Sequence, residues 1–328
     1  MRQVLFLGCL ALSACSGQTP APARAASAAG FPRTVALPGG ASLVVPALPV
    51  RVVPASSTAV DLVAALLPPE RVAGLPEQAL DYSSLADKPG AWARLPTFYS
   101  YLAEPVLALL PDVVMADPWN QPETTARLRE AGLTLFLLPE VKNWPDARAL
   151  LVLAGKVLGA DERAASLAAE LDLRVAELRE AAAARGPVRA LTYSNFGGSG
   201  WSAGSGTTVH AIMELCGVEN AAAAGGRTGH FSIGFEQLLT LDPDVILTSL
   251  PLREGAGPAG DRGGASRELL LSEPRLRGLK AVRTGSVLAL PARYLATGSH
   301  ELVTAAEGLS RELARWHARA GGAEGARQ

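Results

Sequence analysis

Two glutamates begin segments of this chain that repeat one another. Residues 104–114 and residues 236–246 each read as a glutamate, a short apolar helix, a Pro-Asp pair and a β-branched strand. A glutamate in the first turn of a helix is favoured by the helix dipole, and the proline ends the helix. The apolar run that follows suits a buried parallel strand. The repeat therefore predicts two similar lobes, with Glu104 and Glu236 at equivalent corners where they could dock onto a symmetric structure.

The motifs that could support catalysis are incomplete. Gly204-Ser-Gly206 resembles the start of a dinucleotide-binding loop but lacks the third glycine. His300-Glu301 begins like the helix of a zinc protease, but Thr304 stands where the second histidine is required. A Gly-Lys-Ser/Thr phosphate loop does not occur in the sequence. We therefore do not expect an enzyme.

The first 30 residues have the features of an export signal and a tether. Met1-Arg2 is followed by an apolar stretch from residue 4 to residue 12, which is too short to span a bilayer. Leu12-Ser-Ala-Cys15 resembles the lipobox of bacterial lipoproteins, in which the cysteine carries lipid. We predict a signal peptide over 1–15, lipidation of Cys15 and a flexible tether over 16–30, rich in Ala, Pro and Ser. The protein is expected to be exported and lipid-anchored to a bacterial membrane, facing the periplasm or the cell exterior.

Composition narrows the range of partners. The chain has 328 residues, a formal net charge of −1 and three cysteines, and it carries no basic run. Nucleic acid is therefore not an expected partner. Cys9 leaves with the signal peptide and Cys15 takes the lipid, so Cys216 cannot form an intramolecular disulfide and is interpreted as a small buried apolar residue. The remaining length allows two domains and a sizeable core.

Beyond the tether, strands alternate with short helices in two blocks. We predict an N-terminal α/β lobe over 31–143, beginning with a hairpin, and a C-terminal α/β lobe over 187–318, followed by a frayed tail over 319–328. Parallel sheets are expected in both lobes, because the strands are linked through helices.

Residues 144–186 connect the two lobes through helices. Residues 161–185 are strong helix formers and would extend about 37 Å. Leu167, Leu171, Val175 and Leu178 recur at helical spacing and should face the lobes. The fold class is therefore α/β, with two parallel-sheet lobes joined by one long rigid helix.

The chain resembles the substrate-binding lipoproteins of ABC importers, in the class that carries vitamin B12, ferric siderophores and heme. The marks are the opening hairpin, residues 49–53, the two glutamate segments, the long helix and Leu215-Cys-Gly-Val-Glu-Asn220. The resemblance implies two lobes that sandwich a metal chelate, with modest closure because the connecting helix is rigid. It also implies a monomer that docks through Glu104 and Glu236 onto arginines of a dimeric permease, which works with its ATPase.

The resemblance places the ligand between the lobes, where loops follow the carboxyl ends of the strands. Large flat ligands favour aromatic side chains there, and a guanidinium can pair with a carboxylate or stack on a ring. The predicted ligand-binding residues are Phe98, Tyr99, Tyr101 and Trp119 from the first lobe, and Trp201, His230, Phe231, Arg293 and Tyr294 from the second. No firm metal site is predicted, although Tyr99, Tyr101 and His230 are of types that can ligate heme iron.

Several ligands and roles stay open at this point. We favour a ferric siderophore, because the hairpin and residues 49–53 resemble the iron-siderophore members most. Cobalamin is second, supported by Leu215–Asn220 but weakened because Phe98 and His230 stand where the B12 binder carries tryptophans; heme is third. No cofactor is expected, the ligand being an iron or cobalt chelate. A non-transporting sensor or scaffold lipoprotein and a chelatase-like enzyme are the alternative roles, since fold alone does not exclude either.

Overall fold

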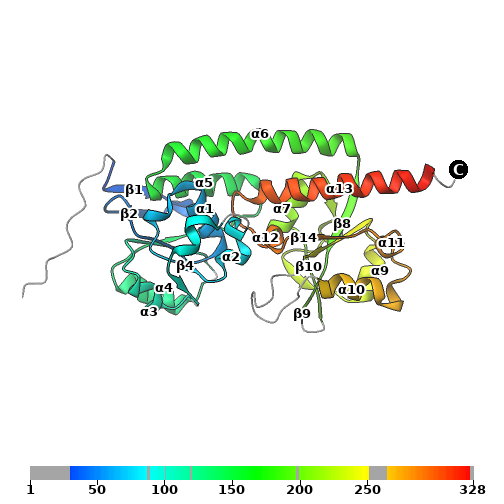
Figure 1. The fold of residues 1–328 in the computed structure, drawn as a ribbon, viewed down its shortest axis with the longest axis horizontal. Coiled ribbons are helices and arrows are strands. Elements are labelled where there is room, and N and C mark those ends of the chain that lie inside the picture. Colours follow the sequence, from blue (N-terminus) through cyan, green and yellow to red (C-terminus); the bar gives the residue numbers. More distant parts are fainter. Residues whose placement is uncertain are drawn as a thin grey trace, which may run out of the picture.

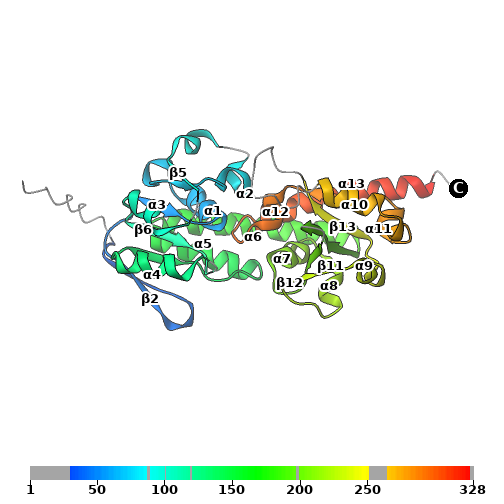
Figure 2. The same cartoon turned by 90° about the horizontal axis from the view of Figure 1, so that it is seen from below.

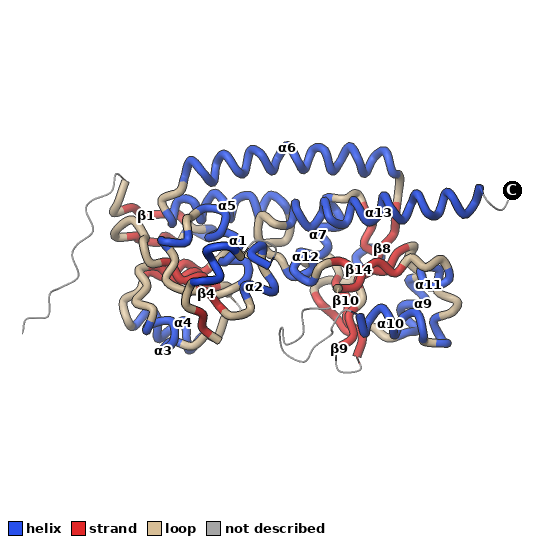
Figure 3. The backbone as a smooth tube through the Cα atoms, viewed as in Figure 1, coloured by secondary structure: helices blue, strands red, loops and turns tan. Residues whose placement is uncertain are grey.

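The protein folds into two α/β lobes that lie side by side along one long helix (Figure 1). The computed structural model describes residues 30–86, 89–99, 101–118, 120–196, 199–250 and 264–325. Strands gather into two separate groups, one in each lobe (Figure 3). The predicted signal peptide, Cys15, nearly all of the predicted tether and Trp119 lie outside the described residues.

The N-terminal lobe contains a hairpin and a parallel sheet. In the hairpin, β1 (Arg33–Ala36) pairs antiparallel with β2 (Ser42–Val45), as predicted. The sheet has the order β3-β6-β7 and is parallel throughout, while β4 pairs in parallel with β5. These strands are β3 (Val52–Pro54), β4 (Leu75–Pro76), β5 (Thr97–Phe98), β6 (Val113–Ala116) and β7 (Thr134–Leu137). The helices are α1 (Ser57–Leu66), α2 (Ala79–Tyr82), α3 (Ala103–Ala108) and α4 (Pro122–Glu130).

Residue type explains why this sheet forms the centre of the lobe. All the residues of β3 and β6 are buried, so both faces of these strands are covered. Such continuous apolar strands are typical of parallel sheets with helices on each side. Val52 and Val72 form a single parallel bridge, because the chain enters β4 only at Leu75.

The C-terminal lobe has a four-stranded parallel sheet in the order β11-β8-β13-β14 and a smaller antiparallel sheet in the order β12-β10-β9. The strands are β8 (Val188–Thr192), β9 (Ser194–Phe196), β10 (Ser199–Ala203), β11 (Val218–Asn220), β12 (His230–Ser232), β13 (Val245–Ser249) and β14 (Val287–Leu290). The helices are α7 (Thr208–Leu215), α8 (Ala221–Ala224), α9 (Phe235–Leu241), α10 (Gly264–Ser272), α11 (Lys280–Arg283), α12 (Ala292–Ala296) and α13 (Leu302–Gly325).

Two helices connect the lobes, α5 (Trp144–Leu158) and α6 (Asp161–Arg185). Asn143 caps α5 by accepting a hydrogen bond from the backbone N–H of Asp146. Gly159 ends α5 in the left-handed region at φ 66°, and a Cβ there would lie 2.5 Å from Leu48. The turn is therefore restricted to glycine by both conformation and space.

Helix α6 runs across both lobes on one side of the molecule (Figure 1). The four leucine and valine residues predicted to face the lobes are buried: Leu167, Leu171, Val175 and Leu178. The prediction of a long connecting helix with this apolar face is confirmed.

One hydrophobic core continues from lobe to lobe. Buried residues of β3, α1, α5, α6, α7 and α13 belong to a single cluster of packed side chains. Viewed from below, α12 lies at the junction between the lobes (Figure 2). Helix α13 begins at Leu302 and continues to Gly325, so the tail predicted to fray from 319 is helical up to that residue.

Cys216 is 1% exposed, and its thiol donates to the carbonyl of Ala306, 3.0 Å away, which confirms the prediction of a buried residue. Burial raises the pKa of this thiol to about 12, so it does not act as a nucleophile. Within the described parts of the chain, none of the helices combines the length and the apolar character that crossing a bilayer requires.

Candidate functional site

A pocket of about 420 Å³ lies between the lobes and is walled by both of them. It has the size of a small-molecule site. The first lobe contributes Ser57, Thr58, Asp117, Pro118, Pro139, Glu140 and Val141, the second contributes Gly206, Thr207, Thr208, Gly229 and His230, and Ala296 and Gly298 come from the segment around α12. Most of these residues follow the carboxyl ends of parallel strands or begin a helix, which is where α/β folds bind ligands. We call this pocket the interlobe pocket.

Two helices from opposite lobes begin at the interlobe pocket. Helix α1 is capped by Ser56, whose hydroxyl accepts from the backbone N–H of Ala59 at 3.1 Å. Helix α7 is capped by Thr207, whose hydroxyl accepts from the N–H of His210 at 3.2 Å and donates to the carbonyl of Gly204 at 2.8 Å. These caps fix the first turns of the helices, so that Thr58 and Thr208 line the pocket with hydroxyl groups.

Two carboxyl groups also line this pocket. Asp117 follows β6, and its backbone N–H donates to Oδ1 of Asn120 at 2.7 Å. Burial raises the pKa of Asp117 to about 6, and a hydrogen bond from the Ser56 side chain partly offsets this rise. Glu140 forms an ion pair with Lys142 at 2.9 Å. Since no lysine or arginine lines the pocket among the described residues, its chemistry favours neutral or cationic ligands that donate hydrogen bonds.

Of the eight predicted ligand-binding residues that the structure describes, only His230 lines the interlobe pocket. Among those from the first lobe, Phe98 is buried in a core cluster with residues of β3 and β6, and does not reach the pocket. Tyr101 packs against the same cluster, with its hydroxyl buried beside Thr125. Tyr99 is 78% exposed. The first-lobe aromatic residues are therefore not brought together around one ligand in this arrangement.

The second-lobe residues are also dispersed. Trp201 is 41% exposed on β10. Phe231 packs on the second-lobe core, beneath the guanidinium of Arg227. Arg293 stacks on Tyr294 with 4.6 Å from Cζ to the ring centroid, and Tyr294 packs against the shared core. None of these four residues lines the interlobe pocket.

Sequence reasoning missed the two carboxyl groups of the pocket. A usable signal existed for Asp117, because it directly follows a predicted strand and the carboxyl ends of parallel strands form ligand sites. Glu140 follows β7 by three residues and carried the same signal. Neither residue is aromatic, so neither fits the expectation that a large flat ligand is held mainly by aromatic side chains.

Both candidate docking residues, Glu104 and Glu236, are exposed. They lie in the first turns of α3 and α9, on the side of the molecule away from α6 (Figure 1). Glu104 forms an ion pair with Arg127 at 2.9 Å, with both side chains largely exposed. Such a pair is weak in water, so it leaves Glu104 available to another partner.

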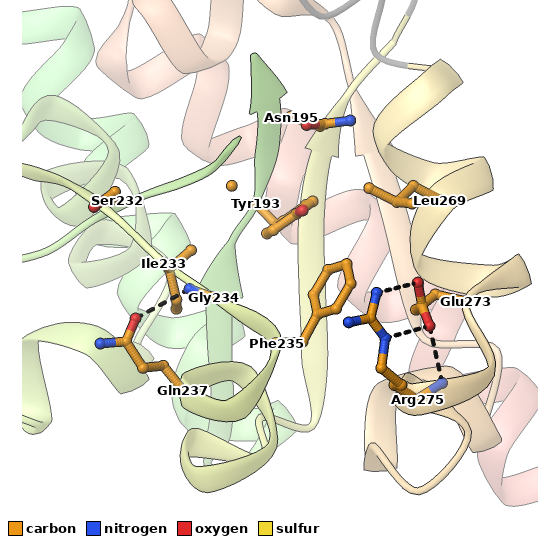
Figure 4. A pocket seen from close by; sticks show the side chains of 11 residues that line it. Tyr193, Asn195, Ser232, Ile233, Gly234, Phe235, Gln237, Leu269, Glu273 and Arg275 are labelled. Carbon is orange, nitrogen blue, oxygen red and sulfur yellow. Dashed lines mark hydrogen bonds and ion pairs between the residues drawn. The ribbon is translucent and has the colours of Figure 1, made fainter. Parts of the chain in front are cut away.

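A second pocket of about 670 Å³ lies within the C-terminal lobe, next to α9 and α10 (Figure 4). The guanidinium of Arg275 stacks on Phe235 and makes two hydrogen bonds to Glu273, at 2.8 and 2.9 Å. These bonds hold the pKa of Glu273 down, at about 2. The charged side chains of this second pocket are paired with each other, and one lobe alone forms the pocket. We therefore regard the interlobe pocket as the stronger candidate.

The described parts of the chain contain no group of three or more histidine, cysteine, aspartate or glutamate side chains that could hold a metal ion.

Comparison with known proteins agrees with this arrangement. A cobalamin-binding protein of Halobacterium salinarum is 29% identical over 194 residues, which are 58% of this chain and 50% of that protein, so the chain spans about half the length of the curated relatives it matches. A periplasmic heme-binding protein of Pseudomonas aeruginosa is 25% identical with a TM-score of 0.68, over 81% of this chain and 93% of that one. An Fe3+-hydroxamate transport protein of Saccharomonospora viridis is 22% identical with a TM-score of 0.67, over 86% of this chain and 99% of that one.

The family model described as periplasmic binding protein matches residues 52–294, from β3 in the N-terminal lobe to α12. This match covers both lobes and the connecting helices, and it agrees with a binding protein and not with an enzyme. The chain belongs to the periplasmic binding protein family.

Proposed function

We propose that this protein is the substrate-binding component of an ABC importer, which captures a metal chelate between its lobes and delivers it to a permease. The observation that carries the proposal is the interlobe pocket, because a pocket walled by both lobes can respond to a ligand that joins them. Lipidation of Cys15 would anchor the protein to a membrane, with residues 16–30 as the tether.

We further propose that the ligand is a neutral or cationic chelate rich in amide groups. The pocket presents the carboxyl groups of Asp117 and Glu140 together with the hydroxyl groups of Thr58 and Thr208, and these accept hydrogen bonds from amide N–H groups. Anionic chelates, such as catecholate siderophores or heme with its two propionates, would meet neither lysine nor arginine among the described lining residues.

This chemistry favours a corrinoid, whose periphery carries amides, and it agrees with the relative named as a cobalamin-binding protein. A corrinoid is larger than the pocket, so part of it would extend toward the solvent-exposed mouth. The second candidate is the ferric siderophore that the sequence favoured, restricted to neutral or cationic ferric trihydroxamates. The fold shared with the hydroxamate transport protein agrees with this candidate.

His230 is the side chain we propose to contact the metal. It is exposed in the interlobe pocket, whereas the hydroxyl of Tyr101 is buried beside α4 and Tyr99 lies outside the described lining. Imidazole can replace the axial water of aquocobalamin, which shifts its visible absorption. Binding through His230 would therefore show as a shift that His230→Ala abolishes, and His317→Ala provides the control because His317 is an exposed histidine on α13.

The test of the ligand class is a panel of aquocobalamin, a cationic ferric trihydroxamate, a ferric catecholate and heme, each followed by thermal melting and calorimetry. A ligand at a hundredfold its dissociation constant should stabilise the protein by about 2.7 kcal/mol. We expect aquocobalamin or the trihydroxamate to do so, and the catecholate and heme to bind more weakly. Preferential binding of the anionic chelates would contradict the proposed ligand class, and binding of none would contradict the chelate carrier itself.

The partner is proposed to be a permease dimer with its ATPase, contacted through Glu104 and Glu236. The double variant Glu104→Gln/Glu236→Gln should abolish uptake while ligand affinity stays unchanged, because exposed charges mainly set the rate and register of association. Glu177→Gln/Glu180→Gln on α6 is the matched control, since it removes two exposed charges from the opposite side. Normal uptake by the first variant would remove the docking proposal.

A further inference from the structure

The repeat that contains the two candidate docking glutamates extends to the far ends of their helices. In the first lobe, the Arg51 side chain donates from Nε to the carbonyl of Leu110 at 2.9 Å and from Nη2 to that of Leu109 at 2.6 Å. Asp112 Oδ2 accepts from the backbone N–H of Arg51 at 3.0 Å, and the N–H of Asp112 donates to the Arg51 carbonyl at 3.0 Å. The end of α3 is thereby attached to the residue that precedes β3.

The second lobe makes a corresponding set of bonds, with one arginine bond to the turn in place of two. The Arg189 side chain donates from Nη1 to the carbonyl of Leu241 at 2.7 Å. Asp244 Oδ2 accepts from the N–H of Arg189 at 2.9 Å, and the N–H of Asp244 donates to the Arg189 carbonyl at 2.9 Å. Asp112 and Asp244 are 132 residues apart, as are Glu104 and Glu236. We call the pairs Arg51–Asp112 and Arg189–Asp244 the helix clamps.

Each clamp surrounds a backbone turn that few side chains adopt. Leu110 has φ 49° and Asp242 has φ 36°, and these are the only non-glycine residues with positive φ in the part of the chain that the structure describes. Each follows its docking glutamate by six residues. A left-handed turn at a leucine is unfavourable and persists only where surrounding contacts determine it. The arginine bonds to the carbonyls of this turn supply such contacts.

Short helices depend on contacts of this kind. Helices α3 and α9 contain six and seven residues, too few to be stable alone, so their orientation is set by their buried side and by their ends. Six residues at 1.5 Å each place the glutamate about 9 Å along the axis from the clamp. A change of tilt at the clamped end therefore moves the carboxylate at the other end.

We propose that Arg51 and Arg189 are positioning residues for permease docking, which hold α3 and α9 so that Glu104 and Glu236 keep the spacing that a dimeric permease requires. This inference depends on the proposed function. The same device at the same place in both lobes fits a partner with two equivalent contact points, because both glutamates must then be held in related geometries.

The two clamps differ in how many other contacts support them. Asp244 Oδ1 also pairs with Lys280 at 2.5 Å, and Arg189 also pairs with Glu219 at 2.8 Å. By contrast, Oδ1 of Asp112 is buried and has no hydrogen-bond partner in the described structure, and the one further contact of this carboxylate is the backbone N–H of Val50, which donates to Oδ2 at 2.6 Å. The first-lobe clamp therefore depends more on its arginine, and loss of Arg51 should impair docking more than loss of Arg189.

The experiment compares Arg51→Met, Arg189→Met and their combination with Arg148→Met. The control removes an arginine that pairs with Asp172 at 2.7 Å between α5 and α6, far from either docking helix. Docking is measured as binding of the aquocobalamin- or trihydroxamate-loaded protein to its permease–ATPase complex in nanodiscs. Ligand affinity, melting temperature and hydrogen exchange of residues 104–109 and 236–241 are followed in parallel.

We expect Arg51→Met to weaken docking about tenfold and Arg189→Met about threefold, with faster hydrogen exchange in the affected helix and ligand affinity within twofold of the unmodified protein. Arg148→Met should leave docking unchanged, even if it lowers the melting temperature as much as the clamp variants do. A general loss of stability would instead weaken docking in all of these variants alike. Arg51→Lys, which keeps one donor, should give an intermediate loss and serves also if the methionine variant does not fold.

The glutamate double variant distinguishes a failure of this inference from a failure of the proposed function. If Glu104→Gln/Glu236→Gln loses docking while the clamp variants dock within twofold of the unmodified protein, the positioning role is wrong and the proposed function stands. If the glutamate variant docks normally, the docking contact itself is wrong, and the role of the clamps falls with it.

Discussion

Asp61 carries a carboxyl group in the protein interior, and its replacement by asparagine should stabilise the protein at neutral and alkaline pH. The side chain is 2% exposed. Its Oδ1 accepts from the N–H of Ser84 at 2.7 Å, and its Oδ2 accepts from the hydroxyls of Ser299 at 2.9 Å and Thr297 at 3.4 Å. These bonds link α1 to the segment between α12 and α13. Asparagine preserves them, because its oxygen can accept from Ser84 and its NH2 group can donate to the two hydroxyls.

The magnitude follows from the pKa. Burial raises the pKa of Asp61 from 3.8 to about 7, with Glu301 adding to the rise and Ser84 and Ser299 opposing it. The folded protein therefore binds this proton more tightly than the unfolded chain does. Stability from this group is complete below pH 4 and is lost as the pH rises toward 7. At 1.36 kcal/mol per unit, ionisation at pH 8 costs as much as about 4 kcal/mol, which Asp61→Asn would recover.

The assay is urea denaturation of both proteins at pH 5, 6, 7 and 8. The difference in the free energy of unfolding should grow with pH in favour of Asp61→Asn, and taking the difference cancels groups that titrate alike in both. Ser299→Ala is the opposing variant: it removes a donor to the ionised carboxylate, so it should destabilise more at pH 8 than at pH 5. A difference for Asp61→Asn that is constant from pH 5 to pH 8 would refute the reasoning.

Three further predictions concern single contacts. Gly204→Ala should lower stability by about 2–4 kcal/mol in urea denaturation, since its Cβ would overlap the backbone carbonyl of Arg227, whereas Gly234→Ala should be neutral because the space around it is open. The carboxyl of Asp117, with a pKa of about 6, becomes an anion between pH 5 and 7, so calorimetry should find that affinity for a cationic trihydroxamate rises over this range. Asp117→Asn should abolish this rise. Arg174→Met should cost about 1.5–3 kcal/mol, because Arg174 makes two hydrogen bonds, at 2.7 and 2.8 Å, to a glutamate of α13; equal stability of the variant would contradict this.

Much of the fold could be predicted from local patterns. The apolar spacing of α6 identified its buried face, since Leu171 and Val175 must meet the same surface of a regular helix. The repeated glutamate segments identified two related lobes, because a helix, a Pro-Asp pair and a strand are all coded locally. The structure departs from these patterns where strands are short, as at Val72, whose pairing depends on neighbours distant in sequence.

The site was harder to predict, because the face that a loop residue presents depends on packing between segments. Phe98 was expected at the ligand, yet it lies in β5, where parallel pairing with β4 fits its ring into the core. His230 was predicted as a loop residue of the second lobe, and the structure has it at the start of β12, lining the interlobe pocket. The contacts of Asp61 with Ser299 join residues 238 positions apart and have no local signature.

The shared core bears on how this protein can recognise its ligand. Residues from both lobes pack in one cluster around α6, and the Asp61 contacts join the lobes a second time beside the pocket. A wide hinge motion would separate these packed side chains and expose apolar surface to water, at about 25 cal/mol for each Å². Closure must therefore be small, and most of the affinity must come from groups that are already in place. In the proposed function, the placement of Asp117, Glu140 and His230 around the interlobe pocket would then select the chelate, because small closure leaves little room to fit a different one.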